Sequence, residues 1–543
     1  MKIKPDLGFW KLWDLSFGFF GVQIAYALQS ANVSRIFTTI GADPHDLSYF
    51  WVLPPLMGLV VQPIVGMMSD KTWTRFGRRL PYLIAGALVA VIVMCLLPNS
   101  GSFQFSIQGA ILFGLVALML LDTSINMAMQ PFKMLVGDMV NEKQKGLAYS
   151  IQSFLCNAGS IVGYILPFVL VWLGLQNQAE TGKVPDTVIW SFYIGAGVLL
   201  LCVIYSLIKI KEWPPKVYAE YNGGGEDAVA KADKPKTNVI SLLKNAPSTF
   251  WTVGVVQFFC WFAFLFLWTY ATNTVAFNAF HTPSTVSYPG ISVNGNDIEG
   301  KYVIANDSII VIDHGKLESD FLASQSSPFT LTTADIVEKS SDGKLQMSGA
   351  NTIQVESAKN CSYITRTVLN AASAEYNEAG NWVGLLYAIQ AIGSVLWAVV
   401  LPKFRSRKLS YTLSLLLGAA GFIMTAFFTN QYLLFIAFAL IGCAWSAMLA
   451  WPFTILTNSL HGGNIGAYLG LFNCTICIPQ IVAALAGGWI LSMLSVPGEL
   501  APEYLMMLIA GISLVIGSAC VAFIREGKGS APVQETPLES ENI

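Results

Sequence analysis

Residues 188–208, VIWSFYIGAGVLLLCVIYSLI, contain no charged side chain. A helix needs about 20 apolar residues to cross the hydrocarbon core of a bilayer. The whole 543-residue chain is 54% hydrophobic and only 12% charged, whereas soluble domains average roughly 25% charged residues. The segment therefore predicts a transmembrane helix, and the composition predicts a membrane protein.

Other apolar stretches of similar length run along the rest of the chain. No Asp, Glu, Lys or Arg stands between Lys408 and Glu499, which leaves room for three spans there. With residues 188–208 included, the sequence predicts twelve spans, beginning near Leu15, Tyr49, Leu80, Ile107, Leu147, Val188, Phe250, Asn381, Tyr411, Gln431, Ile465 and Pro502.

The basic residues of the short loops predict the orientation. They fall in alternate loops, and the opposite short loops hold only Lys183. Because short basic loops stay in the cytoplasm, both termini are expected inside. The basic loop residues are Lys71, Arg75, Arg78, Arg79, Lys133, Lys143, Lys145, Lys403, Arg405, Arg407 and Lys408.

Two polar stretches interrupt the apolar pattern. Residues 211–237 are rich in Pro, Gly and charge, which is typical of a flexible cytoplasmic linker between two six-helix halves. Residues 281–378 are polar and contain alternating β-branched residues and an Asn-Gly turn signal. This pattern predicts a small β-rich extracytoplasmic insert. The insert could be a lid, a decoration or a binding module. The expected divisions are a six-helix bundle at 1–210, a linker at 211–245, a second bundle at 246–525 containing the insert, and a disordered tail at 526–543.

A lone carboxylate lies deep inside one predicted span. Asp122 has no charged neighbour before Lys133, and the other ionisable residue well inside a span is Arg35, toward the outer side of the first. Charges inside membranes are costly and usually functional, and burial favours the neutral form of a carboxyl group. Asp122 is therefore a candidate proton-coupling site; the alternative is a structural acid, neutral or paired with Arg35. Arg35 could assist proton release or contact the substrate.

Neutral amides and large aromatic side chains accumulate in the spans. They suit sugars, whose hydroxyls need donor–acceptor pairs and whose apolar ring faces stack on indoles. Each residue could equally pack the core or join helices. The candidate substrate contacts are Gln23, Tyr26, Gln29, Asn32, Asn126, Gln130, Gln257, Trp261, Trp268, Asn273, Gln390, Trp445 and Asn473.

The loop after the second span reads GMMSDKTWTRFGRR, residues 66–79. Positive-inside anchoring explains its arginines but not the Gly–Asp–Gly spacing. We expect a cytoplasmic gate here, in which Asp70 holds an arginine or a helix N-terminus. The gate residues are Gly66, Asp70, Arg75, Gly77, Arg78 and Arg79.

Several functional classes find little support in the residues. No basic tract suggests nucleic acid, and the nine cysteines form no cluster with metal-ligand spacing. No nucleophile–base set or phosphate loop supports an enzyme. The sequence predicts neither a metal nor a cofactor, apart from a coupling ion.

Two six-span halves with a central linker resemble the major facilitator architecture. The 66–79 loop resembles that superfamily's G-x-x-x-D…G-R-R signature. Several longer stretches resemble plant sucrose carriers and the glycoside–pentoside–hexuronide:cation symporter group, including its sucrose/maltose-type bacterial members. These stretches are residues 21–41, 51–70, 76–87, 121–138 (LDTSINMAMQPFKMLVGD) and 469–488.

The resemblance implies a proton acceptor at Asp122, with Asn126 as the family's asparagine. It covers nearly all the spans but not the insert, and residues 268–275 lack the charges that plant carriers have there. It implies proton-coupled uptake of a disaccharide or glucoside, with Na⁺ less suited than H⁺ to a single carboxylate. The expected location is a bacterial inner membrane, and the expected form is a monomer. The alternatives are a passive sugar facilitator and a membrane sugar sensor.

Overall fold

A computed structural model describes most of the chain. The described residues are 4–103, 107–141, 143–179, 182–222, 244, 246–300, 302–305, 308–311, 321–334, 336–339, 345–404, 406–459, 471–496 and 498–524. Most of the predicted linker and the whole predicted 526–543 tail lie outside these ranges.

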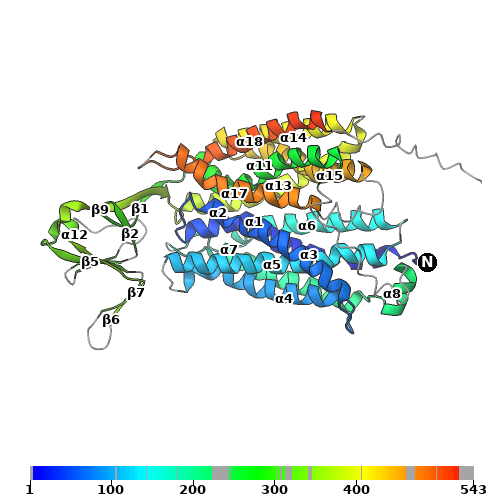
Figure 1. Cartoon of the computed structure of the whole chain (residues 1–543), viewed down its shortest axis with the longest axis horizontal. Coiled ribbons are helices and arrows are strands. Elements are labelled where there is room, and N and C mark those ends of the chain that lie inside the picture. The colour runs from blue at the N-terminus through cyan, green and yellow to red at the C-terminus, as the bar shows by residue number, and fades with distance from the viewer. Residues whose placement is uncertain are drawn as a thin grey trace, which may run out of the picture.

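The described residues of the first half form six long helices and three short ones, whose arrangement Figure 1 shows. The long helices follow the apolar runs, and α2 is separated from α3 just before two prolines, Pro54 and Pro55. The elements are α1 (Phe9–Thr39), α2 (Leu47–Phe50), α3 (Leu53–Lys71), α4 (Leu80–Leu96), η1 (Leu97–Ser102), α5 (Ile107–Met139), α6 (Lys145–Trp172), α7 (Asp186–Lys209) and α8 (Pro215–Asn222).

The described residues of the second half form six further long helices. The helix predicted from Asn381 begins earlier, because Ser373 caps it by accepting a hydrogen bond from the Tyr376 backbone N–H (3.1 Å). The start predicted at Ile465 lies outside the described residues. The helices are α11 (Ser248–Asn278), α13 (Ala374–Val400), α14 (Arg407–Phe427), α15 (Leu434–Ser459), α17 (Cys474–Leu494) and α18 (Glu503–Cys520).

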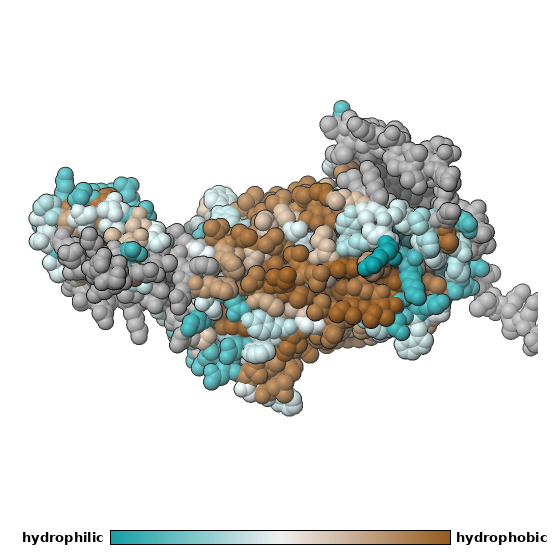
Figure 2. Space-filling view, turned by 90° about the horizontal axis from the view of Figure 1, so that it is seen from below, coloured by the Kyte–Doolittle hydropathy of each residue, from teal (hydrophilic) through white to brown (hydrophobic). Residues whose placement is uncertain are grey.

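Eleven stretches of the described chain are long and apolar enough to span a membrane. Helix α1 is not among them; it is 31 residues long but carries buried Gln23, Gln29, Asn32 and Arg35. Figure 2 shows hydrophobic residues over the middle of the bundle and polar ones toward its ends. The predicted all-α membrane fold with a small β insert is confirmed.

The insert forms a separate β-rich body at one end of the bundle (Figure 1). Its sheets have the orders β2-β1-β9, β4-β3-β5-β8 and β6-β7. The predicted Asn294–Gly295 turn joins β1 to β2, and both residues have positive φ, as hairpin turns require. The strands are β1 (Ser284–Val293), β2 (Asn296–Glu299), β3 (Tyr302–Ala305), β4 (Ser308–Val311), β5 (Phe329–Ala334), β6 (Ile336–Lys339), β7 (Leu345–Ser348), β8 (Asn351–Val355) and β9 (Cys361–Leu369).

The two halves meet at the end of the bundle that carries the insert, which we call the insert end; the opposite end, beside α8, is the linker end. Here α17 packs on α2, and α13 packs on α6. Hydrogen bonds join the halves at the insert end; they link Ser34 to Trp268, Arg35 to Asn377 and Asn381, and His45 to Ser495. The structure is therefore closed at the insert end.

Candidate functional site

Asp122 lies on α5 and is 2% exposed. Gln29 of α1 donates a hydrogen bond from Nε2 to Asp122 Oδ1 (2.7 Å), while Asp122 Oδ2 has no partner among the described residues. No ion pair of the described chain includes Asp122. The carboxyl group therefore sits in the bundle with one amide partner and no cation to balance a charge.

Amides extend this cluster toward α3. Asn126 donates to the backbone carbonyl of Asp122 (2.9 Å), and Gln62 donates to Asn126 Oδ1 (2.7 Å). The i, i+4 spacing predicted that Asn126 and Asp122 share a helix face. No pattern in the sequence singles out Gln62, which the packing of α3 on α5 brings into the site.

Arg35 is not paired with Asp122. It is fully buried, and it donates to Asn381 Oδ1 (2.7 Å) and Asn377 Oδ1 (3.1 Å) of the second half and to Asn177 Oδ1 (3.1 Å) of its own. Gly380 makes room for it, because a Cβ there would lie 2.6 Å from Arg35 Cδ. Arg35 thus joins the halves at the insert end, away from the carboxyl group.

The predicted tryptophans do come together. Trp445 of α15 packs edge-on against Trp261 (5.7 Å between ring centroids) and Trp268 (6.0 Å) of α11. Trp51 of the first half stacks on Trp268 at 6.2 Å. These four rings form an aromatic cluster that crosses the boundary between the halves near the insert end.

Several buried polar atoms near the boundary have no partner among the described residues. An unpaired buried polar group costs about 1–3 kcal/mol, so such atoms mark places where a ligand or water can bind. Within the candidate set, they are Gln29 Oε1, Arg35 Nε, Asp122 Oδ2, Gln257 Oε1, Trp261 Nε1 and Gln390 Oε1.

The remaining candidates have diverse surroundings. Tyr26 lies near Asp122, and Gln130 faces Gly66 across α3 and α5. Gln23 accepts a bond from Ser160, Asn32 donates to its own helix at Leu28, and Asn473 precedes α17, where its amide reaches Cys477. Asn273 bonds Glu503 and Tyr376 and so belongs to a separate polar cluster.

The 66–79 loop forms an ion cluster at the linker end. Asp138 of α5 accepts hydrogen bonds from Arg78 Nη2 (2.6 Å) and Arg79 Nε (3.1 Å). The side chain of Asp70 lies outside the described part of the structure. The acid that both arginines contact in the described structure is Asp138, which was not among the predicted gate residues.

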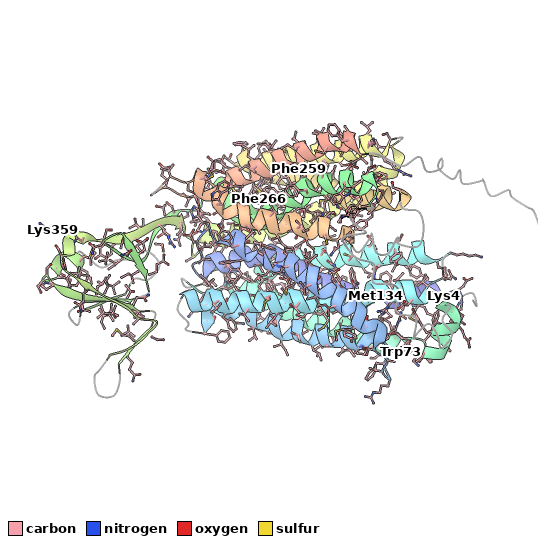
Figure 3. All side chains as sticks on the ribbon, viewed as in Figure 1. Lys4, Trp73, Met134, Phe259, Phe266 and Lys359 are labelled. Carbon is pink, nitrogen blue, oxygen red and sulfur yellow. The ribbon has the colours of Figure 1, made fainter. Side chains whose placement is uncertain are left out.

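Other members of the loop pack around this cluster. Trp73 lies at the linker end (Figure 3), with Tyr218 of α8 at 5.8 Å. Gly66 faces Met134 of α5; a Cβ at Gly66 would lie 3.1 Å from Met134 Cε. Arg75 is exposed and lies over the Phe76 ring.

The first residues of the predicted linker are docked on the first half. Glu212 accepts backbone hydrogen bonds from Arg78 (3.0 Å), Arg79 (2.9 Å) and Leu80 (2.9 Å), which are the free N–H groups at the start of α4. Gly77 has a φ of 111°, and a Cβ there would meet Glu212. Residues 212–222 of the predicted linker thus contact the first half, where Glu212 caps α4 and Tyr218 of α8 lies beside Trp73.

The capping of α4 by Glu212 predicts an effect on protein stability. We expect Glu212→Ala to destabilise the folded protein by about 1–2 kcal/mol, because three N–H groups lose a charged acceptor. The thermal unfolding midpoint of purified protein should fall by a few degrees. The matched control is Glu499→Ala, at an exposed acid between α17 and α18; equal midpoints for the two variants would contradict the capping role.

Sequence reasoning missed one buried acid. Glu503, the first residue of α18, is 6% exposed and accepts a hydrogen bond from Asn273 (2.8 Å). The sequence prediction placed no ionisable residue well inside a span of the second half and did not name Glu503. The one sequence feature that could have identified Glu503 is its position at the start of the span predicted from Pro502.

The architecture and the paired halves can now be compared with known proteins. The profile of the Major Facilitator Superfamily matches residues 15–295 and 359–541. The chain belongs to the Major Facilitator Superfamily. It is therefore a multi-pass membrane protein of a transporter family, and the interruption of the match falls within the insert.

Curated relatives are similar over part of their length. A Membrane-associated transporter protein of Mus musculus is 30% identical over 209 residues, 37% of this chain and 38% of that protein. The Sucrose transport protein SUT1 of Oryza sativa subsp. japonica is 23% identical, covering 54% of this chain and 57% of that protein. The General alpha-glucoside permease of Schizosaccharomyces pombe is 25% identical, covering 46% of each. The chain thus spans about half the length of these relatives or less.

Solved transporters share the fold over almost the whole chain. The nucleoside transporter NupG aligns with a TM-score of 0.58 at 12% identity, covering 95% of this chain and 99% of that one. A D-xylose-proton symporter aligns with a TM-score of 0.57 at 14% identity, covering 96% and 98%. At this identity the likeness establishes the fold alone.

Proposed function

We propose that this protein is a proton-coupled symporter that carries a neutral disaccharide or glucoside, of maltose or sucrose type, into the cell. The observation that carries the proposal is the buried Asp122 carboxyl group, with one amide partner and no cation in contact. Relatives named for sucrose and alpha-glucoside transport support the substrate class. A relative from Rattus norvegicus, 24% identical over 226 residues, is named Proton-associated sugar transporter A.

The surroundings of Asp122 favour a proton over a metal ion. Sodium, like other hard cations, prefers several oxygen ligands. No group of three or more His, Cys, Asp or Glu side chains that could hold a metal occurs in the described part of the chain. A lone carboxyl group binds a proton without further ligands, and its neutral form is the cheaper one in a membrane interior.

The boundary between the halves favours a neutral, ring-shaped substrate. The aromatic cluster of Trp51, Trp261, Trp268 and Trp445 offers apolar faces, and Trp261 has an unused N–H donor. The unpaired oxygens of Gln257 and Gln390 accept hydrogen bonds from hydroxyl groups. Facilitator-type folds place substrate sites between the halves near the midplane, and these residues lie on helices that border that boundary.

The transport cycle follows from these groups. With the insert end open, Asp122 takes a proton from outside, which removes a buried charge and favours sugar binding. The halves then close at the insert end, the state described here, and sugar and proton leave at the linker end, where the Arg78–Arg79–Asp138 cluster holds α5 and the 66–79 loop of the first half together as one unit. We place the insert outside the cell, both termini in the cytoplasm, and the protein in the cytoplasmic membrane as a monomer.

Uptake of radiolabelled maltose and sucrose into proteoliposomes tests this function. We expect at least one sugar to accumulate above equilibrium under an inward proton gradient, and to leave again when a protonophore collapses the gradient. Liposomes without protein provide the baseline. Uptake that stops at equilibrium whatever the gradient would replace the proposal with a passive facilitator, and sugar binding without flux would replace it with a sensor.

A further inference from the structure

A second buried carboxyl group lies in the C-terminal half, at the insert end. Glu503 Oε1 accepts a hydrogen bond from Asn273 Nδ2 (2.8 Å), and Asn273 Oδ1 accepts one from Tyr376 Oη (2.8 Å). These residues come from α18, α11 and α13. Glu503 Oε2 is buried and has no partner in the described part of the chain. The carboxyl group is therefore held at one oxygen and unsatisfied at the other.

The charged and titratable groups that face Glu503 do not stabilise its anion. They are Tyr270 of α11, Tyr376 of α13 and Asp43 of the α1–α2 connection. Burial opposes the ionisation of Asp43, but His45 and Arg366 hold the pKa of that carboxyl group below its usual range, so Asp43 is charged. An ionised Glu503 would face this negative charge, and no ion pair of the described residues includes Glu503. The closed state therefore favours the neutral form of Glu503.

The same cluster touches the surface where the halves close. Tyr376 lies beside Thr38 of α1 in the first half. On the other side, a Cβ at Gly487 of α17 would lie 2.8 Å from Tyr270 Oη and 2.9 Å from Ser48 Cβ of α2. The contact between α17 and α2 thus covers the Tyr270 hydroxyl group, which faces Glu503. Opening this contact would admit water to the cluster.

We propose that Glu503 is a second proton-binding carboxyl group, which must be protonated before the insert end can close. Ionised Glu503 is stable only when water reaches it, which requires the open state. A proton arriving from outside neutralises it, and the halves then seal over it. The proposal rests on the proposed symport, and it gives the C-terminal half its own proton-dependent step, separate from Asp122.

Closure can be measured without sugar or transport. Ser48 is fully buried in the closed state, so the thiol of Ser48→Cys should react with a maleimide only when the insert end is open. The full-length protein is placed in lipid nanodiscs, and labelling of the native cysteines is subtracted. At each pH the labelling rate is divided by that of the same cysteine in the denatured protein, because the thiolate is the reactive form and its fraction rises with pH. We expect this corrected rate to rise with pH, with an open-to-closed ratio that changes by up to about tenfold per pH unit.

The pH response should depend on Glu503. In Glu503→Gln, whose side-chain oxygen can still accept from Asn273, we expect low labelling at every pH. The control Glu499→Gln, at an exposed acid nearby, should respond like the parent. Asp122→Asn should keep the pH response if Glu503 is an independent site. A pH response that survives in Glu503→Gln, or is lost in Asp122→Asn alone, would overturn the proposal.

A second variant, Tyr376→Phe, keeps the proposal testable if Glu503→Gln does not fold. Tyr376→Phe keeps the carboxyl group but removes the hydroxyl that joins Asn273 to the surface at Thr38. We expect the pH response to remain but the open state to be more populated at every pH, since the contact of this hydroxyl with Thr38 of the first half is made only when the halves are closed. Failure of sugar uptake with an intact, Glu503-dependent labelling response would reject the transport function and leave this inference standing.

Discussion

Asp122→Asn is expected to abolish gradient-driven sugar accumulation while preserving exchange of labelled for unlabelled sugar. The asparagine oxygen can still accept the hydrogen bond that Gln29 donates to Asp122 (2.7 Å), so the substitution removes the titration and little else. Without proton binding the carrier has no link to the gradient, so labelled sugar should rise only to equilibrium. Proteoliposome uptake with and without an inward proton gradient measures both activities.

The control for this prediction is Asp186→Asn. Asp186 is an exposed acid at the start of α7, and its replacement should leave both accumulation and exchange unchanged. If Asp122→Asn accumulated sugar as well as the parent protein, Asp122 would be a structural acid. If it lost exchange together with accumulation, Asp122 would serve substrate binding as well as coupling.

Gly488→Ala is expected to hold the insert end open and to reduce uptake strongly. A Cβ at Gly488 of α17 would meet the backbone carbonyl of His45, and it would lie 2.9 Å from the Tyr49 ring, both in the first half. The backbone cannot move aside as a flexible side chain can. Overpacking costs about 1–3 kcal/mol, which corresponds to a fall of roughly 5–150-fold in the closed-to-open ratio.

Initial uptake rates in cells, corrected for the amount of protein in the membrane, measure this effect. Gly197→Ala on α7 is the matched control, because a Cβ there meets no atom within 4 Å. Its uptake should equal that of the parent. Normal uptake by Gly488→Ala would mean that transport does not require the close contact of α17 with the α1–α2 connection.

Local patterns in the sequence were enough for part of the site. A bilayer selects long apolar helices whatever their partners, so the spans could be located one by one. Asp122 was noticeable because its own neighbours lack charge, and Asn126 because i+4 spacing fixes a shared helix face. The Asn294–Gly295 turn was predicted for a similar reason, since its two residues tolerate positive φ.

Partners distant in the chain could not be predicted in this way. Glu212 follows the α4 N-terminus by more than a hundred residues and binds there through backbone N–H groups, which no side-chain pattern records. Arg35 finds its asparagines on α13 and in the α6–α7 connection. Glu503 lies at a helix start, where sequence alone suggests water, and only packing under α11 and α13 buries it.

The sequence by itself thus determined which segments enter the membrane and which carboxylate lies deepest among them, because hydrophobic transfer acts on each segment independently. The tertiary structure alone decided which end is closed, which acid holds the linker-end arginines, and that the C-terminal half has a buried acid of its own. Those properties depend on contacts between helices far apart in the chain, where burial and the loss of water set the cost of each charge.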